Sequence, residues 1–249
     1  MVILKTLKEI EIMREAGLLN YACHEEVRKH IAPGVTTWEL DCIAEKFIRG
    51  VGAKPAFKGY MGYPATINAS INEEVVHGIP SKDRKLKKGD IISIDLGVIW
   101  KDYFADSANT YPVEEVSPDL QKLINVTEEC LKLGISQMTV NNHLGDVSNA
   151  IQKHAESFGY SVVRDLVGHG IGRRMHEDPK VPNFGRKGTG IKLAVGMVLA
   201  IEPMINMGKY QIDILNDKWT VVTRDRKPSA HFEHTVAVTE NGPKILTAP

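Results

Sequence analysis

Cysteine is scarce in this chain of 249 residues, which contains only Cys23, Cys42 and Cys130. The three lie far apart in the sequence and form none of the closely spaced pairs that are typical of structural zinc sites. A set that is sparse and odd in number also argues against a disulfide framework and fits a reducing compartment. We therefore expect a cytoplasmic protein.

The chain also lacks an excess of one charge and a long apolar run. Lysine plus arginine and aspartate plus glutamate number 31 each, so nothing draws the whole chain to nucleic acid or to an acidic membrane. At the start, only Val2 to Leu4 are apolar before Lys5, which is too short for a signal sequence or a membrane span. The composition, with 43% hydrophobic and 25% charged residues, is that of a globular protein. The length suits one large domain, residues 1–249.

Cap signals and apolar spacing predict four helices. Thr6 with Glu9 and Thr36 with Glu39 form capping boxes, in which the hydroxyl and the carboxylate can each satisfy a free backbone N–H. Pro118 suits the first turn of a helix that opens at Ser117. The predicted helices run from about 7 to 29, from 36 to about 50, from 117 onward and from 144 to 158.

Strand patterns follow each pair of helices. Residues 60–80 combine glycines, tyrosines and short apolar alternations, which favours strands with tight turns. Residues 90–113 predict a β-hairpin that turns near Lys101-Asp102, and strands return from Tyr160 to the end. The order is thus helix, helix, strands, given twice. It favours an α+β fold with an internal duplication around one sheet, although no residue repeat supports the duplication.

Two aspartates, Asp95 and Asp106, lie in the predicted hairpin. Side chains alternate between the faces of a strand, and a two-residue turn puts both carboxylates on the same face. Directly opposed Cβ atoms are about 5 Å apart, so the two charges repel each other. A pair of divalent cations roughly 3.5–4 Å apart would compensate them. The hairpin alone instead favours a plainer interpretation, with one aspartate in the turn and the other in solvent.

Three later segments each place one potential metal ligand in an apolar or glycine-rich context. His169 lies between glycines in 168–172, where the backbone can approach a ligand closely. Glu202 lies near the end of an apolar strand in 196–203, and Glu233 lies inside a predicted strand over 230–238. Each glutamate could also be a strand-end charge that reaches solvent. Together with the aspartates they make four carboxylates and one histidine, a set that suits Mn, Fe, Co or Zn ions.

This series of residues resembles the metal set of type I methionine aminopeptidases, which have the pita-bread fold. The resemblance covers nearly the whole chain and rests on several motifs in the same order. They are the N-terminal helix, residues 60–64, 71–80 and 168–172, and the sequence Phe232-Glu233-His234-Thr235. The fold it implies is a central antiparallel sheet with helices packed on one face and pseudo-two-fold internal symmetry.

The resemblance implies a role for each ligand. Asp106 and Glu233 would bridge two divalent ions (Co, Mn, Fe or Zn), Asp95 would hold one ion, and His169 with Glu202 would hold the other. A bridging water would be the nucleophile, with Glu202 as the general base.

Two further histidines, His77 and His176, resemble the family residues that bind substrate near the scissile bond. One would contact the peptide nitrogen, and the other would stabilise the oxyanion. Without the metal set, both would be interpreted as polar loop residues.

The resemblance also implies a pocket for the methionine side chain. An apolar, aromatic-lined hollow suits an unbranched thioether, although Phe57 and Trp219 would by themselves be interpreted as core residues. Two positions depart from the family pattern, since Asn68 stands where several bacterial relatives have cysteine and Met175 where they often have phenylalanine. The implied pocket residues are Phe57, Tyr60, Tyr63, Asn68, Met175 and Trp219.

The implied activity is hydrolysis of the bond after the initiator methionine of nascent proteins whose second residue is small. The partners would be nascent polypeptide N-termini, with the ribosome as a candidate, and the enzyme is expected to be a monomer. A prolidase or Xaa-Pro aminopeptidase is the nearest rival. Those enzymes usually carry an extra N-terminal domain, whereas the first predicted helix here begins at about Leu7. A binding protein that kept the fold without catalysis is the other rival, and such proteins typically lose metal ligands.

Overall fold

The structure is a computed structural model that describes residues 1–249. It contains the four predicted helices, and each predicted boundary lies within two residues of the observed one. Both capping boxes are present, with reciprocal bonds between Thr6 and Glu9 and between Thr36 and Glu39. Ser117 caps the third helix and Pro118 begins it, as predicted. The helices are α1 (Leu7–Arg28), α2 (Thr37–Gly50), α3 (Pro118–Ser136) and α4 (Leu144–Ser157).

A nine-stranded sheet forms the centre of the molecule, and all of its strand pairs are antiparallel. Seven strands follow the order β1-β4-β5-β14-β9-β7-β8, while β2 pairs with β4 and β15 pairs with β14. The strands are β1 (Lys54–Pro55), β2 (Ile67–Ile71), β4 (Ile91–Trp100), β5 (Tyr103–Pro112), β7 (Gly168–Gly170), β8 (Glu177–Val181), β9 (Val198–Ile201), β14 (Glu233–Thr239) and β15 (Gly242–Ile245).

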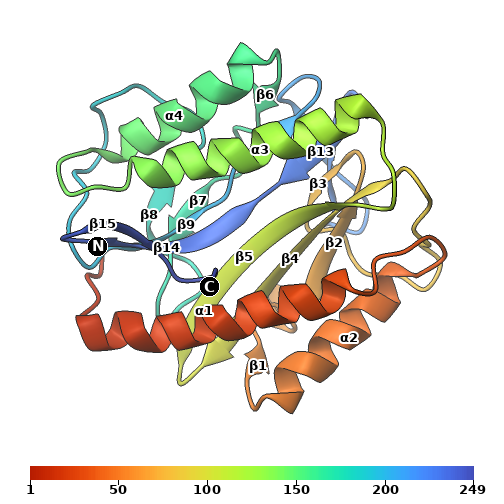
Figure 1. Cartoon of the computed structure of the whole chain (residues 1–249), viewed down its shortest axis with the longest axis horizontal. Helices are drawn as coiled ribbons and strands as arrows, with labels where there is room; N and C mark the ends of the chain where they lie inside the picture. The colour runs from red at the N-terminus through yellow and green to blue at the C-terminus, as the bar shows by residue number, and fades with distance from the viewer.

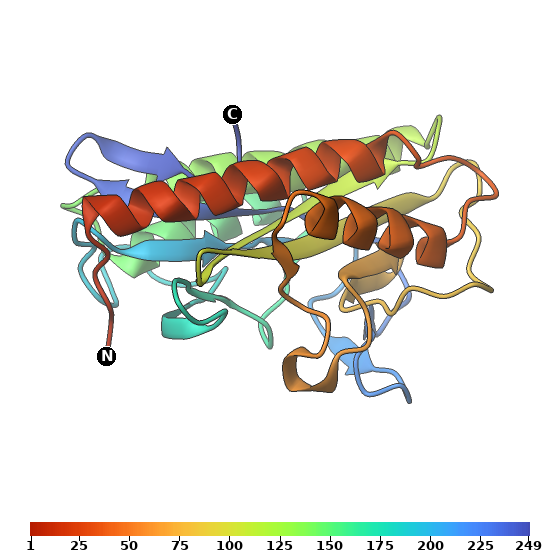
Figure 2. The same cartoon turned by 90° about the horizontal axis from the view of Figure 1, so that it is seen from below.

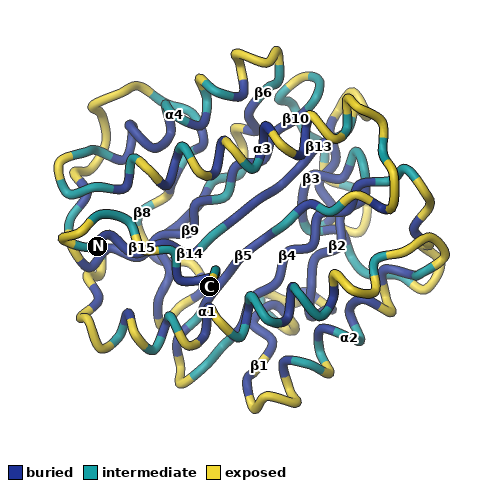
Figure 3. The backbone as a smooth tube through the Cα atoms, viewed as in Figure 1, coloured by how far each residue is buried: buried dark blue, intermediate teal, exposed yellow.

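Each pair of helices lies over its own half of the sheet (Figure 1). Side chains of α1 and α2 form one buried cluster with β2 and β4, and side chains of α3 and α4 form another with β9 and β14. The middle strands are buried along most of their length, whereas the outer faces of the helices are exposed (Figure 3). This arrangement matches the helix, helix, strands order that the sequence gives twice.

Two small sheets complete the fold. One has the strand order β13-β10-β6 and the other β11-β12-β3. Figure 2 shows the segments around β11 and β12 projecting from the side of the central sheet opposite to α1. Their strands are β3 (Glu74–Val76), β6 (Ser161–Val162), β10 (Met204–Asn206), β11 (Ile212–Ile214), β12 (Val221–Thr223) and β13 (Ser229–His231). None of the helices combines the length and the apolar composition needed to cross a membrane.

The β4–β5 hairpin turns at Lys101 and Asp102, as predicted. Both residues have positive φ angles, 48° and 64°, which are required by the two-residue turn that matches strand twist. Asp95 pairs with Ala108 and Asp106 pairs with Gly97, so the two aspartates are diagonal neighbours on one face. Even-numbered β4 residues such as Leu96 pack in the cluster with α1 and α2, so the aspartates lie on the opposite face.

Two strand predictions were wrong. Residues 60–62 form a short 3₁₀ helix, η1 (Tyr60–Gly62), and no strand begins in this segment before Ile67. The reason is local, because Met61 and Gly62 have φ angles of 49° and 89°, which an extended strand does not allow.

The predicted strand over 230–238 is instead two strands in different sheets, divided at Phe232. The strands that pair with these two, β9 with β14 and β10 with β13, are also separated from each other. Pro203 lies between β9 and β10 and has no N–H to donate to a strand ladder. Phe232 N–H donates to the Pro203 carbonyl at this point. Glu202 and Glu233 therefore lie at these two breaks between strands.

A buried ion pair ties the segment before α1 to β8. Lys5 Nζ lies 2.6 Å from Glu177 Oε2, and the two side chains are only 4% and 2% exposed. Gly172 makes room for the pair, since a Cβ there would lie 2.5 Å from Lys5 Cε. Neither charge can reach water, so each depends on the other.

We expect Lys5→Met to destabilise the protein by about 3–5 kcal/mol, because it leaves the Glu177 carboxylate buried without an opposite charge. Denaturant unfolding in the presence of a chelator measures the change. Lys8→Met, at an exposed position nearby, is the control. The double variant Lys5→Met/Glu177→Leu should regain most of the lost stability. Equal stability of the Lys5→Met and Lys8→Met variants would contradict the prediction.

Candidate active site

A cavity of about 180 Å³ brings together every site residue that the sequence analysis named. It lies against the face of β4 and β5 that points away from the helices. Sequence reasoning missed one lining residue, Met61, whose exposed side chain gives no pattern to detect. The lining residues are Phe57, Tyr60, Met61, Tyr63, Asn68, His77, Asp95, Asp106, His169, Met175, His176, Glu202, Trp219 and Glu233.

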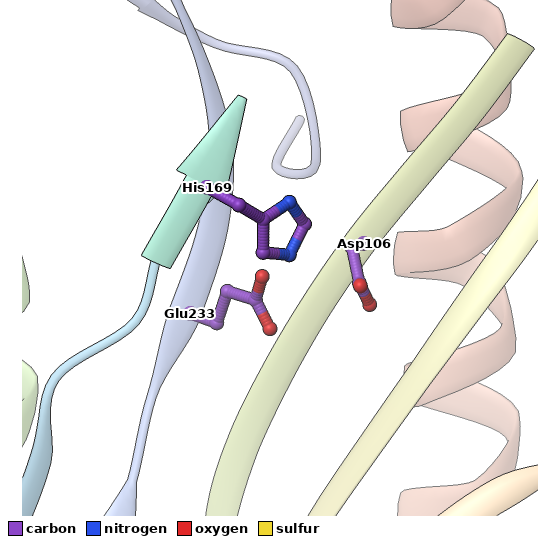
Figure 4. A group of neighbouring side chains, drawn as sticks. All are labelled: Asp106, His169 and Glu233. Atoms are coloured by element: carbon purple, nitrogen blue, oxygen red, sulfur yellow. The ribbon is translucent and has the colours of Figure 1, made fainter. Parts of the chain in front are cut away.

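Three strands bring potential metal ligands to one point. Asp106 comes from β5, His169 from β7 and Glu233 from β14, and each offers a ligand atom within 4.8 Å of the others. Figure 4 shows the imidazole and the two carboxylates directed into a common space. Glu202 joins them from the segment directly after β9, with its Oε1 atom 3.6 Å from His169 Nε2.

The carboxylates of Asp95, Asp106 and Glu233 are buried, and the Glu202 side chain is only 15% exposed, so their negative charges are poorly solvated. Burial is the main reason that the pKa of Asp95 rises to about 7, and the Asn68 hydrogen bond opposes this rise. Burial, together with repulsion from neighbouring carboxylates, holds the pKa values of Asp106, Glu202 and Glu233 well above their usual range. Asp95 Oδ1, Asp106 Oδ1 and Glu233 Oε1 are buried with no hydrogen-bond partner. A bound cation would satisfy such oxygens, and divalent ions fit this donor set.

His169 is prepared to offer its Nε2 lone pair. Its Nδ1 lies 2.9 Å from the Gly170 carbonyl, which can only accept a hydrogen bond, so the proton sits on Nδ1. Burial lowers the pKa of His169 to about 4, so the ring stays neutral, as a metal ligand must.

The two glycines that flank His169 allow the neighbouring strands to pack closely against β7. A Cβ at Gly168 would lie 2.4 Å from the Ala200 carbonyl oxygen, and one at Gly170 would lie 2.2 Å from that of Asp178. They let β9 and β8 approach closely, which is a different reason from the ligand approach that the sequence suggested.

Beside the carboxylates lies an apolar hollow. Phe57, Tyr63 and Met175 are buried together, and Tyr60 and Trp219 pack against them. The Tyr63 and Trp219 rings meet edge to face, with centroids 5.1 Å apart.

The two histidines near this hollow differ in exposure. His77 has a left-handed φ angle of 60° at the end of β3 and is half-buried. Burial lowers its pKa to about 4. His176 is an exposed residue that lines the cavity, and its ring centroid lies 4.2 Å from the ring centroid of His169.

Comparison with known proteins identifies the family. Residues 11–240 match the model of metallopeptidase family M24. A methionine aminopeptidase of Clostridium acetobutylicum is 53% identical over 247 residues, which cover 99% of each chain. This chain belongs to the methionine aminopeptidases of family M24. It is therefore a metal-dependent aminopeptidase, as the sequence motifs predicted.

Solved structures agree with this family. A methionine aminopeptidase of Thermotoga maritima superimposes with a TM-score of 0.98 at 46% identity, and the match covers 100% of both chains. A prolidase of Pyrococcus horikoshii reaches a TM-score of 0.81 at 23% identity, and this chain covers 63% of it. That likeness shows the fold alone. The predicted pita-bread fold is confirmed, and the sequence identity separates this methionine aminopeptidase from the prolidases.

Asn68 contacts one of the candidate metal ligands, Asp95, directly. Its side-chain N–H₂ donates to Asp95 Oδ2 at 2.7 Å, and its own side chain is buried. The bond fixes one carboxylate oxygen and leaves the partnerless Oδ1 for a cation. A thiol at this position would be a much weaker donor.

We expect Asn68→Ala to weaken metal binding about 10- to 100-fold, because groups that orient a ligand typically contribute that much to affinity. Titration calorimetry of chelator-treated protein with Mn or Co measures the change. Asn125→Ala, on the exposed face of α3, is the matched control. Unchanged affinity in Asn68→Ala would show that Asp95 needs no support from this amide.

Proposed function

We propose that this enzyme removes the initiator methionine from nascent polypeptides whose second residue is small, using two divalent cations. The observation that carries the proposal is the juxtaposition, in one cavity, of buried partnerless carboxylates with an apolar, aromatic hollow. The carboxylates are suited to binding two divalent cations, and the hollow is suited to an unbranched thioether side chain. Because the site draws on strands throughout the chain, we propose that residues 1–249 act as one catalytic domain.

The ligands divide between two ions in this proposal. Asp106 and Glu233 would contact both ions, Asp95 would complete one, and His169 with Glu202 would complete the other. When bound, such a pair of divalent ions makes a water molecule acidic and polarises the scissile carbonyl. Mn, Fe, Co and Zn all suit these carboxylate and imidazole donors.

The remaining groups of the cavity bind the peptide and move protons. Glu202 accepts a proton from the attacking water and passes it to the leaving amine. His77 contacts the peptide nitrogen, and His176 donates to the oxygen that gains negative charge. The methionine side chain fills the hollow formed by Phe57, Tyr60, Tyr63, Asn68, Met175 and Trp219.

Metal-dependent release of methionine tests the proposal. Chelator-treated protein should be inactive on Met-Ala-Ser and should regain activity with Co, Mn, Fe or Zn. A Xaa-Pro peptide, which a prolidase-like enzyme would cleave, should remain intact. Metal-free protein with full activity would refute the two-ion proposal.

We expect the second residue of the substrate to control the rate through steric overlap. That residue must pass His77 and the ligand set in a cavity of only about 180 Å³. Peptides beginning Met-Ala, Met-Gly or Met-Ser should be cleaved, while those beginning Met-Leu, Met-Lys or Met-Phe should be cleaved very slowly, because a close-packed site rejects bulk. Comparable kcat/KM values for Met-Ala and Met-Lys peptides would contradict this expectation. Docking on the ribosome and action as a monomer remain predictions.

A further inference from the structure

The hydroxyl of Tyr60, whose ring packs in the apolar hollow, lies within hydrogen-bond distance of the His176 ring. Tyr60 Oη lies 2.8 Å from His176 Nδ1, and the ring centroids are 5.5 Å apart with planes inclined by 35°. The imidazole of His176 makes no other hydrogen bond to the protein. Tyr60 is therefore the one group that can orient it by hydrogen bonding.

The backbone holds Tyr60 in place. Tyr60 N–H donates to the Phe57 carbonyl at 2.9 Å, and Gly59 N–H donates to the Tyr63 carbonyl at 2.8 Å. Met61, the next residue, has a left-handed φ angle of 49°, a conformation that costs a residue with a Cβ about 1–2 kcal/mol. The turn that holds Tyr60 therefore contains backbone strain, and strain of this kind is typical of functional sites.

The backbone of His176 is also fixed on both sides. Met175 before it is 1% exposed, and Glu177 after it is held by Lys5 at 2.6 Å. Rotation of the ring and the position of its proton are the freedoms that remain, and both depend on the Tyr60 contact.

His169 and His176 lie side by side but have opposite partners. At His169, Nδ1 faces a carbonyl oxygen, which can only accept, so Nε2 carries the lone pair. At His176, Nδ1 faces a phenol, which can donate, so Nε2 can carry the proton. A metal ligand needs the first tautomer, whereas a donor to a developing oxyanion needs the second.

We propose that Tyr60 is a positioning residue that donates to His176 Nδ1 and thereby keeps the proton of His176 on Nε2, ready for the oxyanion. The inference rests on the proposed function, in which His176 stabilises that oxygen. It assigns to the Tyr60 hydroxyl a task separate from the contact of its ring with the methionine side chain.

Tyr60→Phe removes the hydroxyl and keeps the ring. We expect kcat for Met-Ala-Ser to fall about 10-fold, the effect of losing one useful hydrogen bond, while KM and metal content stay near the parent values. Tyr21→Phe, on α1 across the sheet, should match the parent. A Tyr60→Phe enzyme whose kcat is unchanged would overturn the proposal.

A double-mutant cycle with His176→Ala distinguishes positioning from a general structural effect. If Tyr60 acts through His176, then Tyr60→Phe should lower kcat no further once His176 is alanine. Full additivity of the two losses would overturn the proposal.

The imidazole ¹⁵N chemical shifts of His176 supply a readout that does not depend on turnover. The metal-loaded parent should show the proton on Nε2, and Tyr60→Phe should show a mixture of tautomers. A parent with the proton on Nδ1 would reject the Tyr60 proposal whether or not the enzyme is active. A parent with the expected tautomer that releases no methionine would instead reject the proposed function.

Discussion

Asp106→Asn and Glu233→Gln are expected to abolish both metal binding and methionine release. Each change keeps the shape of the side chain and removes one negative charge from a buried set that has no other compensation. Since these two carboxylates are the proposed bridges, either loss affects both ions. The metal content and the rate of Met-Ala-Ser cleavage should therefore fall together, as measured by metal analysis and steady-state kinetics. A variant with parental metal content and turnover would show that the residue was misassigned.

The metal-free forms of these variants should be more stable than the metal-free parent at neutral pH. Burial and repulsion raise the pKa of Asp106 in the folded protein, so an acid that ionises readily when unfolded resists ionisation when folded. The stability linked to its bound proton is present below the unfolded pKa and is lost as the pH rises through the folded value. An asparagine has no such loss.

Thermal unfolding with chelator at pH 8 measures this difference. A higher unfolding temperature for Asp106→Asn would exclude misfolding as the cause of lost metal. Asp102→Asn, in the exposed turn of the same hairpin, should leave metal content and turnover unchanged. A metal-free Asp106→Asn variant that is less stable than the parent would contradict the argument.

Local signals in the sequence predict the helices and the hairpin well. The capping boxes are complete within four residues, and the Lys101-Asp102 turn fixes the register of the whole β4–β5 ladder. For this reason the shared face of Asp95 and Asp106 could be derived from period and turn length alone. The diagonal offset between them follows from the same register.

The convergence of the remaining ligands could not be derived in this way. His169, Glu202 and Glu233 meet Asp106 only because β14 inserts between β5 and β9, and no local pattern specifies that order. The local contexts of these residues nominate them as ligands, whereas only the family resemblance implied that they meet at one site. Contacts such as Lys5 with Glu177 and Tyr60 with His176 also join residues far apart in the chain, and the left-handed Met61 has no sequence signal. These features depend on tertiary packing.

His176→Ala is expected to lower kcat about 100- to 1,000-fold with little change in KM, the range for loss of one oxyanion donor. The proposed bond forms fully only when the carbonyl oxygen gains charge, so its loss raises the barrier without weakening substrate binding. Because His176 is exposed, alanine should leave no buried cavity, and the unfolding temperature should match that of the parent.

Metal content distinguishes His176 from its neighbour. His176 is outside the proposed ligand set, so His176→Ala should bind metal like the parent, whereas His169→Ala should lose metal as well as rate. Kinetics on Met-Ala-Ser and metal analysis for both variants make the comparison, and His30→Ala at an exposed position is the control. If His176→Ala loses metal, then its role is ligation. If only KM rises, then the role is ground-state binding, and the oxyanion donor has to be sought at His77, the remaining histidine of the cavity outside the proposed ligand set.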